Sequence, residues 1–86
     1  MNRGWVASPE YRVIVMALRS ARSEMAVSQR ELAKRLGKPP SFINKIELLE
    51  RRVDVLEFIA IARALGLDAS ELLKTATAAL PSEIRL

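Results

Sequence analysis

Residues 28–47, SQRELAKRLGKPPSFINKIE, decide the fold of this chain. Ser28 stands three residues before Glu31, the spacing in which each side chain of a helix start satisfies an otherwise unpaired backbone N–H. Gly37 can adopt the left-handed conformation that ends a helix, and the prolines that follow it stop that helix while permitting a new one from Pro40. The stretch therefore predicts two short helices joined by a tight turn.

The second of these helices, about residues 40–48, is predicted to have an inner and an outer face. Ile43 and Ile46 point inward. The outer face is mostly polar, with short side chains at spacings i, i+3, i+4 and i+7: Ser41, Asn44, Lys45 and Leu48. A capped short helix, a glycine turn and such a second helix have the geometry of a helix-turn-helix, although other small helical bundles also contain helix pairs of this kind.

Two more helices are predicted at the ends of the chain. Ser8-Pro9 is a typical helix start, and apolar residues then recur every three or four positions up to Met25. Asp68 and Glu71 have the spacing that begins a last short helix. Beyond it, residues 76–86 have no firm assignment.

A further helix between these is strongly apolar. Asp54 and Glu57 form a potential capping box at its start, and Gly66 stops it. Because it carries Val55 and Leu56 as well as the apolar residues that follow, we expect it to be the buried hub. The predicted fold is all-α, a compact domain of five helices at residues 9–75, with an N-terminal arm at 1–8 and a C-terminal tail at 76–86.

The composition restricts the function further. The 86 residues make one domain, half of them are hydrophobic, and none is cysteine or histidine, which excludes disulfides, Cys or His zinc ligands, and Cys or His catalysis. No glycine loop for phosphate and no nucleophile–base pair stands out, so we expect no enzyme, no metal and no cofactor. No apolar run is long enough for a signal peptide or a spanning helix, so we expect a cytoplasmic protein without a membrane partner.

The positive charge is concentrated in one stretch. Residues 28–52 hold seven of the 14 Lys and Arg but three of the 10 Asp and Glu, an excess equal to the whole net charge of +4. On an ordinary solvated surface the positive charges need not cluster in one place, whereas a surface that attracts phosphate needs such a local excess. This stretch is therefore the candidate site for a polyanion.

Several segments together resemble one known family. SQRELAKRLG at residues 28–37, Ile43, Ile46-Glu47 and IARALGL at residues 61–67 are similar to the lambda-repressor-like (Xre/Cro) helix-turn-helix family. The similarity extends over about residues 14–74. It implies a DNA-binding transcriptional regulator of prokaryotic or phage type that uses the second helix of the pair for recognition.

The resemblance implies which residues read bases and which contact phosphates. The base-reading positions of the family fall on Pro40, Ser41, Asn44 and Lys45. Asn can pair with adenine and Lys can donate to guanine, whereas Pro40 replaces a polar residue often found there. The phosphate-binding positions fall on Gln29, which also braces the recognition helix, and on Lys38, Arg51 and Arg52. Phe42 is placed either against sugar and phosphate or in the minor core.

Two more features follow from the same resemblance. Arg22 and Glu47 occupy positions that often form a buried ion pair, which we interpret as structural. The family commonly has Gly two residues after that Glu, where this sequence has Leu48-Leu49. Either the helix continues for another turn, the reading we favour, or the two leucines form an exposed apolar patch.

The leading functional hypothesis is a repressor or autoregulator that binds an inverted-repeat operator as a homodimer. The dimer contacts are predicted in the last helix and the tail, at Leu72, Leu73, Leu80, Ile84 and Leu86. The alternative is an antitoxin-like or adaptor module that binds another protein and discriminates poorly between DNA sequences. Pro40 and Leu48-Leu49 are the features that favour this alternative.

Overall fold

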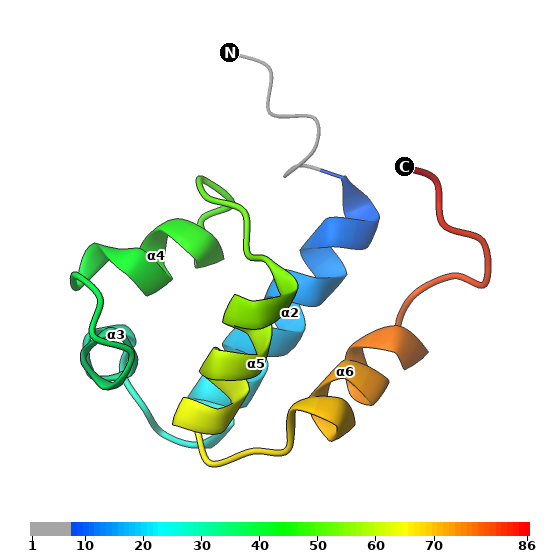
Figure 1. The fold of residues 1–86 in the computed structure, drawn as a ribbon. Helices are drawn as coiled ribbons and strands as arrows, with labels where there is room; N and C mark the ends of the chain where they lie inside the picture. Colours follow the sequence, from blue (N-terminus) through cyan, green and yellow to red (C-terminus); the bar gives the residue numbers. More distant parts are fainter. Residues whose placement is uncertain (1–7) are drawn as a thin grey trace.

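The computed structural model describes residues 8–86, which contain five helices and no strand (Figure 1). The helices are α2 (Pro9–Glu24), α3 (Gln29–Arg35), α4 (Ser41–Glu47), α5 (Val55–Ala64) and α6 (Ala69–Ala78). Helices α3 and α4 lie on one side of α2 and α5, and α6 lies on the other. The predicted all-α, five-helix fold is confirmed. The predicted N-terminal arm, except for Ser8, lies outside the described residues.

Side chains cap the helix starts largely as the sequence predicts. The Ser8 hydroxyl accepts a hydrogen bond from the Tyr11 N–H at 3.1 Å, and Asp54 and Glu57 form a complete capping box. The start of α3 differs from the prediction. Ser28 accepts from the Glu31 N–H at 3.0 Å, but the Glu31 carboxylate accepts from Arg35, one turn along the helix, instead of returning to the cap.

Helices α2, α3, α4 and α5 end in one shared motif. The residue after the C-cap is left-handed in each: Ala26 (φ 57°), Gly37 (φ 66°), Leu49 (φ 62°) and Gly66 (φ 77°). The next N–H then bonds to the carbonyl five residues back, for example from Glu50 to Lys45 at 2.8 Å. Helix α4 therefore ends at Glu47, and the expectation that it would run a turn longer is wrong, because Leu49 takes the conformation usually left to glycine.

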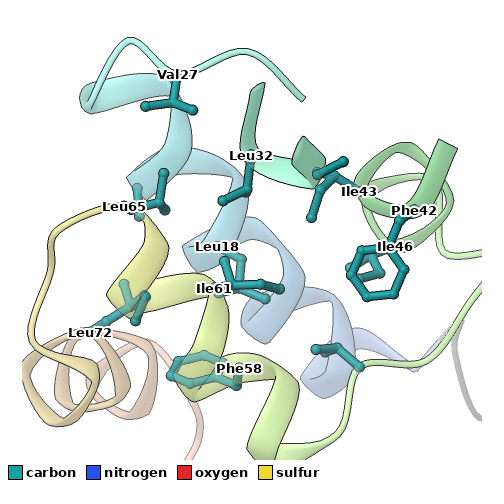
Figure 2. Close-up of a cluster of buried hydrophobic side chains, with 14 residues drawn as sticks. Leu18, Val27, Leu32, Phe42, Ile43, Ile46, Phe58, Ile61, Leu65 and Leu72 are labelled. Atoms are coloured by element: carbon teal, nitrogen blue, oxygen red, sulfur yellow. The ribbon is translucent and has the colours of Figure 1, made fainter. Parts of the chain in front are cut away.

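One hydrophobic core joins all five helices (Figure 2). Leu18, Leu32, Ile46, Ile61 and Leu72 come from α2, α3, α4, α5 and α6 in turn and meet in a single buried cluster. Leu32 and Ile46 are each 1% exposed. Because the cluster includes both short helices, the orientation of α4 is determined by the same packing that stabilises the rest of the domain.

Helix α5 is buried only from its second turn. Phe58, Ile61 and Ala62 face the core, whereas Val55 and Leu56 are 78% and 75% exposed. The expectation of a buried hub is therefore confirmed for Phe58, Ile61 and Ala62 but wrong for Val55 and Leu56 at the first turn. Leu56 lies off the stripe that the buried residues define.

Helix α6 is longer than predicted. It runs to Ala78, past the expected domain boundary at residue 75, and Ala76 is 1% exposed in the core. The small side chain at this position lets α6 pack closely enough for its last turn to belong to the domain. Only residues after the C-cap at Ala79 continue as a tail without helix.

Candidate nucleic-acid interface

Helix α4 has the two faces that the sequence predicts. Ile43 and Ile46 are 2% and 1% exposed and hold the helix against the core. The outer face is exposed to solvent along its length: Ser41, Asn44, Lys45 and Leu48. Pro40, the N-cap of α4, is exposed beside them but provides no side-chain cap. The four candidate base-reading residues thus lie on one accessible surface of an anchored helix.

The C-terminal end of α4 is tied to α2 and α3. Arg22 donates to the two carboxylate oxygens of Glu47 at 2.7 and 3.0 Å, and Gln29 donates to the same carboxylate at 2.8 Å. Arg22 also donates to the Val27 carbonyl at 3.0 Å. The predicted ion pair is therefore present, and Gln29 braces the recognition helix as expected. The contact of Gln29 with a phosphate stays a prediction.

The guanidinium of Arg22 keeps its charge in this environment. Its hydrogen bond to Glu47 raises its pKa above the ordinary value and outweighs the opposing effect of burial. The pair is largely shielded, with 15% of the Arg22 side chain and 7% of the Glu47 side chain exposed. A network of this kind stabilises one orientation of α4 rather than participating in chemistry.

Phe42 lies in the core, 8% exposed, so the core alternative is the correct one for this residue and a phosphate contact by its ring is not supported. Two cations approach the ring. Lys38 Nζ lies 5.5 Å and Arg51 Cζ lies 4.7 Å from its centroid, distances at which a cation is attracted by the aromatic quadrupole. The turn before α4 and the loop after it thus meet at one side chain of α4.

Arg51 is also paired with Glu57, for which the sequence predicts only a role in the helix cap. The two terminal nitrogens of Arg51 donate to the two Glu57 oxygens at 3.0 and 2.7 Å, and one of them also donates to the Arg52 carbonyl at 2.8 Å. The hydrogen bond from Arg51 is the main reason that the pKa of Glu57 is lowered. Arg51 lies in the loop before α5 and Glu57 lies within α5, six residues apart. No helical or strand spacing in the sequence predicts that these two side chains meet.

The predicted dimer residues do not share one environment. Leu72 is 9% exposed and belongs to the core, so its assignment to an interface is wrong: its side chain faces inward toward the other helices. Leu73 and Ile84 are 50% and 47% exposed, Leu86 is fully exposed, and Leu80 is half-buried. These four residues remain available for association.

Residues 8–86 contain no group of three or more acidic or other ligating side chains able to hold a metal ion. Within the same residues, no helix is long and apolar enough to cross a membrane.

Two helices joined by a glycine turn, with the outer face of the second exposed, define a helix-turn-helix domain. The chain matches the helix-turn-helix family model over residues 18–72. It is also similar to the solved structure of an XRE-family-like protein from Pseudomonas syringae pv. tomato str. DC3000, with 43% identity over 84% of this chain and 88% of that one and a TM-score of 0.77.

Two further solved structures are similar at lower identity. The clp gene regulator ClgR from Corynebacterium glutamicum is 25% identical over 83% of this chain and 76% of its own, with a TM-score of 0.71. The hypothetical transcription factor NHTF from Neisseria is 27% identical over 81% and 74%, with a TM-score of 0.63. A comparison with curated proteins gave no match.

The chain belongs to the XRE family of helix-turn-helix proteins, as its sequence resemblance implied. It is a DNA-binding regulator by family.

Proposed function

We propose that this protein represses transcription, including that of its own gene, by placing α4 in the major groove of an operator. The observation that carries the proposal is the exposed row of Ser41, Asn44 and Lys45 on a helix whose opposite face is buried. Side chains on a rigidly held helix keep a defined position relative to base edges, which sequence discrimination requires. The site of action is the nucleoid in the cytoplasm.

In this arrangement the chemistry divides between base and backbone contacts. Asn44 pairs with adenine through its amide, Lys45 donates to guanine, and Ser41 contacts a base or a phosphate. Pro40 offers an apolar contact to a thymine methyl. Gln29, Lys38 and Arg52 contribute backbone contacts, which set the register on the duplex without reading sequence.

A homodimer on an inverted repeat is the second part of the proposal. The surface of α5 and α6 supports it, because exposed Val55 and Leu73 line a groove there together with residues of both charges: Arg52, Arg63, Asp54 and Asp68. A two-fold interface places each of these charges against another part of the same patch, so mixed charges suit self-association. Analytical ultracentrifugation should show a dimer; monomer alone at high micromolar concentration contradicts it.

The main test is a selection from random double-stranded DNA, followed by titration of the selected site against scrambled DNA at fixed physiological salt. We expect an inverted repeat and a specificity ratio of about a thousandfold or more. Lys45→Ala should relax the preference at one base pair of each half-site. Lys74 on α6 is also an exposed lysine, so Lys74→Ala is the control and should leave the preference unchanged.

The alternative function is a protein-interaction module. Leu48, 56% exposed at the end of α4, is the observation that favours it, because an apolar side chain there suits a protein partner better than a DNA backbone. In that case the selection returns no consensus and binding depends on salt but not on sequence. That result rejects the repressor proposal.

A further inference from the structure

Two cations lie on the ring of Phe42, and they differ in their other partners. Arg51 donates to both oxygens of Glu57. Lys38 Nζ forms an ion pair with no carboxylate within residues 8–86, where the salt bridges are those of Arg22, Arg35 and Arg51. Arg51 is therefore neutralised by a direct bidentate pair. The charge of Lys38 acts on Glu57 only at longer range, as the smallest of the causes that lower its pKa, and its ammonium forms no direct ion pair within the described residues.

The position of Glu57 makes this neutralisation persistent. Its carboxylate accepts from the Asp54 N–H at 3.0 Å as part of the α5 capping box, in addition to its two bonds from Arg51. To bind a phosphate, Arg51 would have to give up a bidentate, charge-assisted pair and leave a fixed carboxylate near the DNA. Both changes oppose a phosphate contact by Arg51.

The same contacts connect the recognition helix to the next helix. Phe42 belongs to α4 and is anchored in the core, and Glu57 belongs to the first turn of α5. Arg51 lies in the loop between these helices, with its guanidinium 4.7 Å from the Phe42 centroid and 2.7 Å from a Glu57 oxygen. It therefore links two elements whose relative placement determines how α4 enters a groove.

Resting on the DNA-reading function proposed above, we propose that Arg51 is a positioning residue, held by Phe42 and Glu57, that orients α4 and does not bind phosphate. Lys38, on the same ring, is the cation that contacts the DNA backbone. This assignment replaces the phosphate-binding role that the sequence resemblance implied for Arg51, and keeps the one that it implied for Lys38.

The salt dependence of binding separates the two roles. Each phosphate contact adds about 0.9 to the slope of log affinity against log salt concentration on duplex DNA. The experiment measures this slope on random duplex DNA, and the affinity for the selected site, for three variants. They are Lys38→Gln, the charge-neutral double variant Arg51→Gln/Glu57→Gln, and Arg51→Lys, which keeps the charge but loses the bidentate geometry.

We expect Lys38→Gln to lower the slope by about 0.9 and to weaken selected and random DNA alike. The double variant and Arg51→Lys should keep the wild-type slope and the affinity for random DNA, and should lose about tenfold in affinity for the selected site alone. All measurements are made well below the unfolding midpoint of each variant, checked by circular dichroism, so that loss of folded protein does not contribute.

Two results overturn the assignment. If the double variant loses about 0.9 in slope, Arg51 is a phosphate ligand. If the folded double variant keeps its affinity for both DNAs, the cluster stabilises the domain without orienting α4. A wild-type protein with no sequence preference instead rejects the proposed function, and the slopes on random DNA then still decide which of Lys38 and Arg51 contacts phosphate.

Discussion

Glu47 connects three helices through a single carboxylate. It ends α4 and accepts hydrogen bonds from Arg22 of α2 and Gln29 of α3. When a shielded carboxylate that accepts three hydrogen bonds is replaced, the donors of Arg22 and Gln29 lose a charged acceptor in a partly buried site. The Arg22–Glu47 ion pair, together with the hydrogen bond from Gln29, therefore holds the end of α4 against α2 and α3.

Replacing this carboxylate by an amide should lower the free energy of unfolding substantially. We expect Glu47→Gln to cost about 3 kcal/mol, because Arg22 loses its counter-charge in a shielded site. Glu31→Gln is the matched control: its pair with Arg35 is 45% and 42% exposed, and its loss should cost less than about 1 kcal/mol. Urea denaturation measures both, and equal losses would contradict the special role of Glu47.

The helix ends show how an element can stop without the usual residue. Ala26 and Leu49 occupy left-handed positions that Gly37 and Gly66 occupy elsewhere. An L-residue with a Cβ pays about 1–2 kcal/mol in this conformation. At both sites the packing of the following segment outweighs that cost, since α2 and α4 must turn there for the chain to close the core.

Glycine should therefore stabilise the end of α2. We expect Ala26→Gly to raise the free energy of unfolding by about 0.5–1 kcal/mol, the cost of the left-handed alanine less the greater entropy of glycine in the unfolded chain. Gly37→Ala should lower it by a similar amount, although nothing lies within 4 Å of the added Cβ. Thermal and urea unfolding test both, and two changes of the same sign would contradict the explanation.

The start of α5 should make stability depend on acidic pH. Folding lowers the pKa of Glu57 below its ordinary value of 4.5, chiefly through its hydrogen bond from Arg51. A carboxylate of this kind stabilises the fold above its unfolded pKa and loses that contribution as the pH falls through the lower folded pKa. We expect stability to decline below about pH 4.5.

Glu57→Gln tests this contribution, because it removes the titrating group. The variant should be less stable than the wild type at neutral pH, and the difference should shrink as the pH is lowered below about 4.5. Glu83→Gln in the exposed tail is the control and should follow the wild-type curve. A constant difference between Glu57→Gln and wild type across this range would show that the ion pair does not govern the acid response.

At the scale of the whole molecule, one core must support both folding and the exposed surfaces. All five helices contribute to that core, so we expect unfolding in one cooperative transition. The surfaces available for association are then formed by apolar side chains that lie outside the core. Leu73, next to Leu72 in the sequence, is one of them. The two leucines are adjacent in sequence but differ in exposure, 50% against 9%.

This pair separates stability from association. Leu72→Ala should lower the free energy of unfolding by about 2–3 kcal/mol because it leaves a cavity. Leu73→Ala should change monomer stability by less than about 1 kcal/mol and should weaken the proposed dimer. Urea denaturation at low protein concentration and sedimentation at high concentration provide the two measurements. If Leu73→Ala leaves the dimer unaffected, the interface does not include Leu73 of α6.

Much of the fold could be predicted from local patterns. Ser8, Asp54 and Asp68 cap the starts of three helices, as the sequence predicts. Gly37 and Gly66 follow the ends of two helices, also as predicted. Each of these effects depends on atoms within a few residues of one another, so the sequence expresses them directly. The ion pair of Arg22 and Glu47 came instead from the family resemblance, since nothing local connects residues 25 positions apart.

The sequence by itself determined the five helices, the family and the exposed row on α4, because capping, glycine turns and helical periodicity act over short separations. Only the tertiary structure decided that Phe42 and Leu72 are buried, that Val55 is exposed and that Arg51 pairs with Glu57. Burial depends on which neighbouring elements cover a side chain, and an ion pair across a loop depends on where both ends are placed. Those distances are set by the packing of all five helices together.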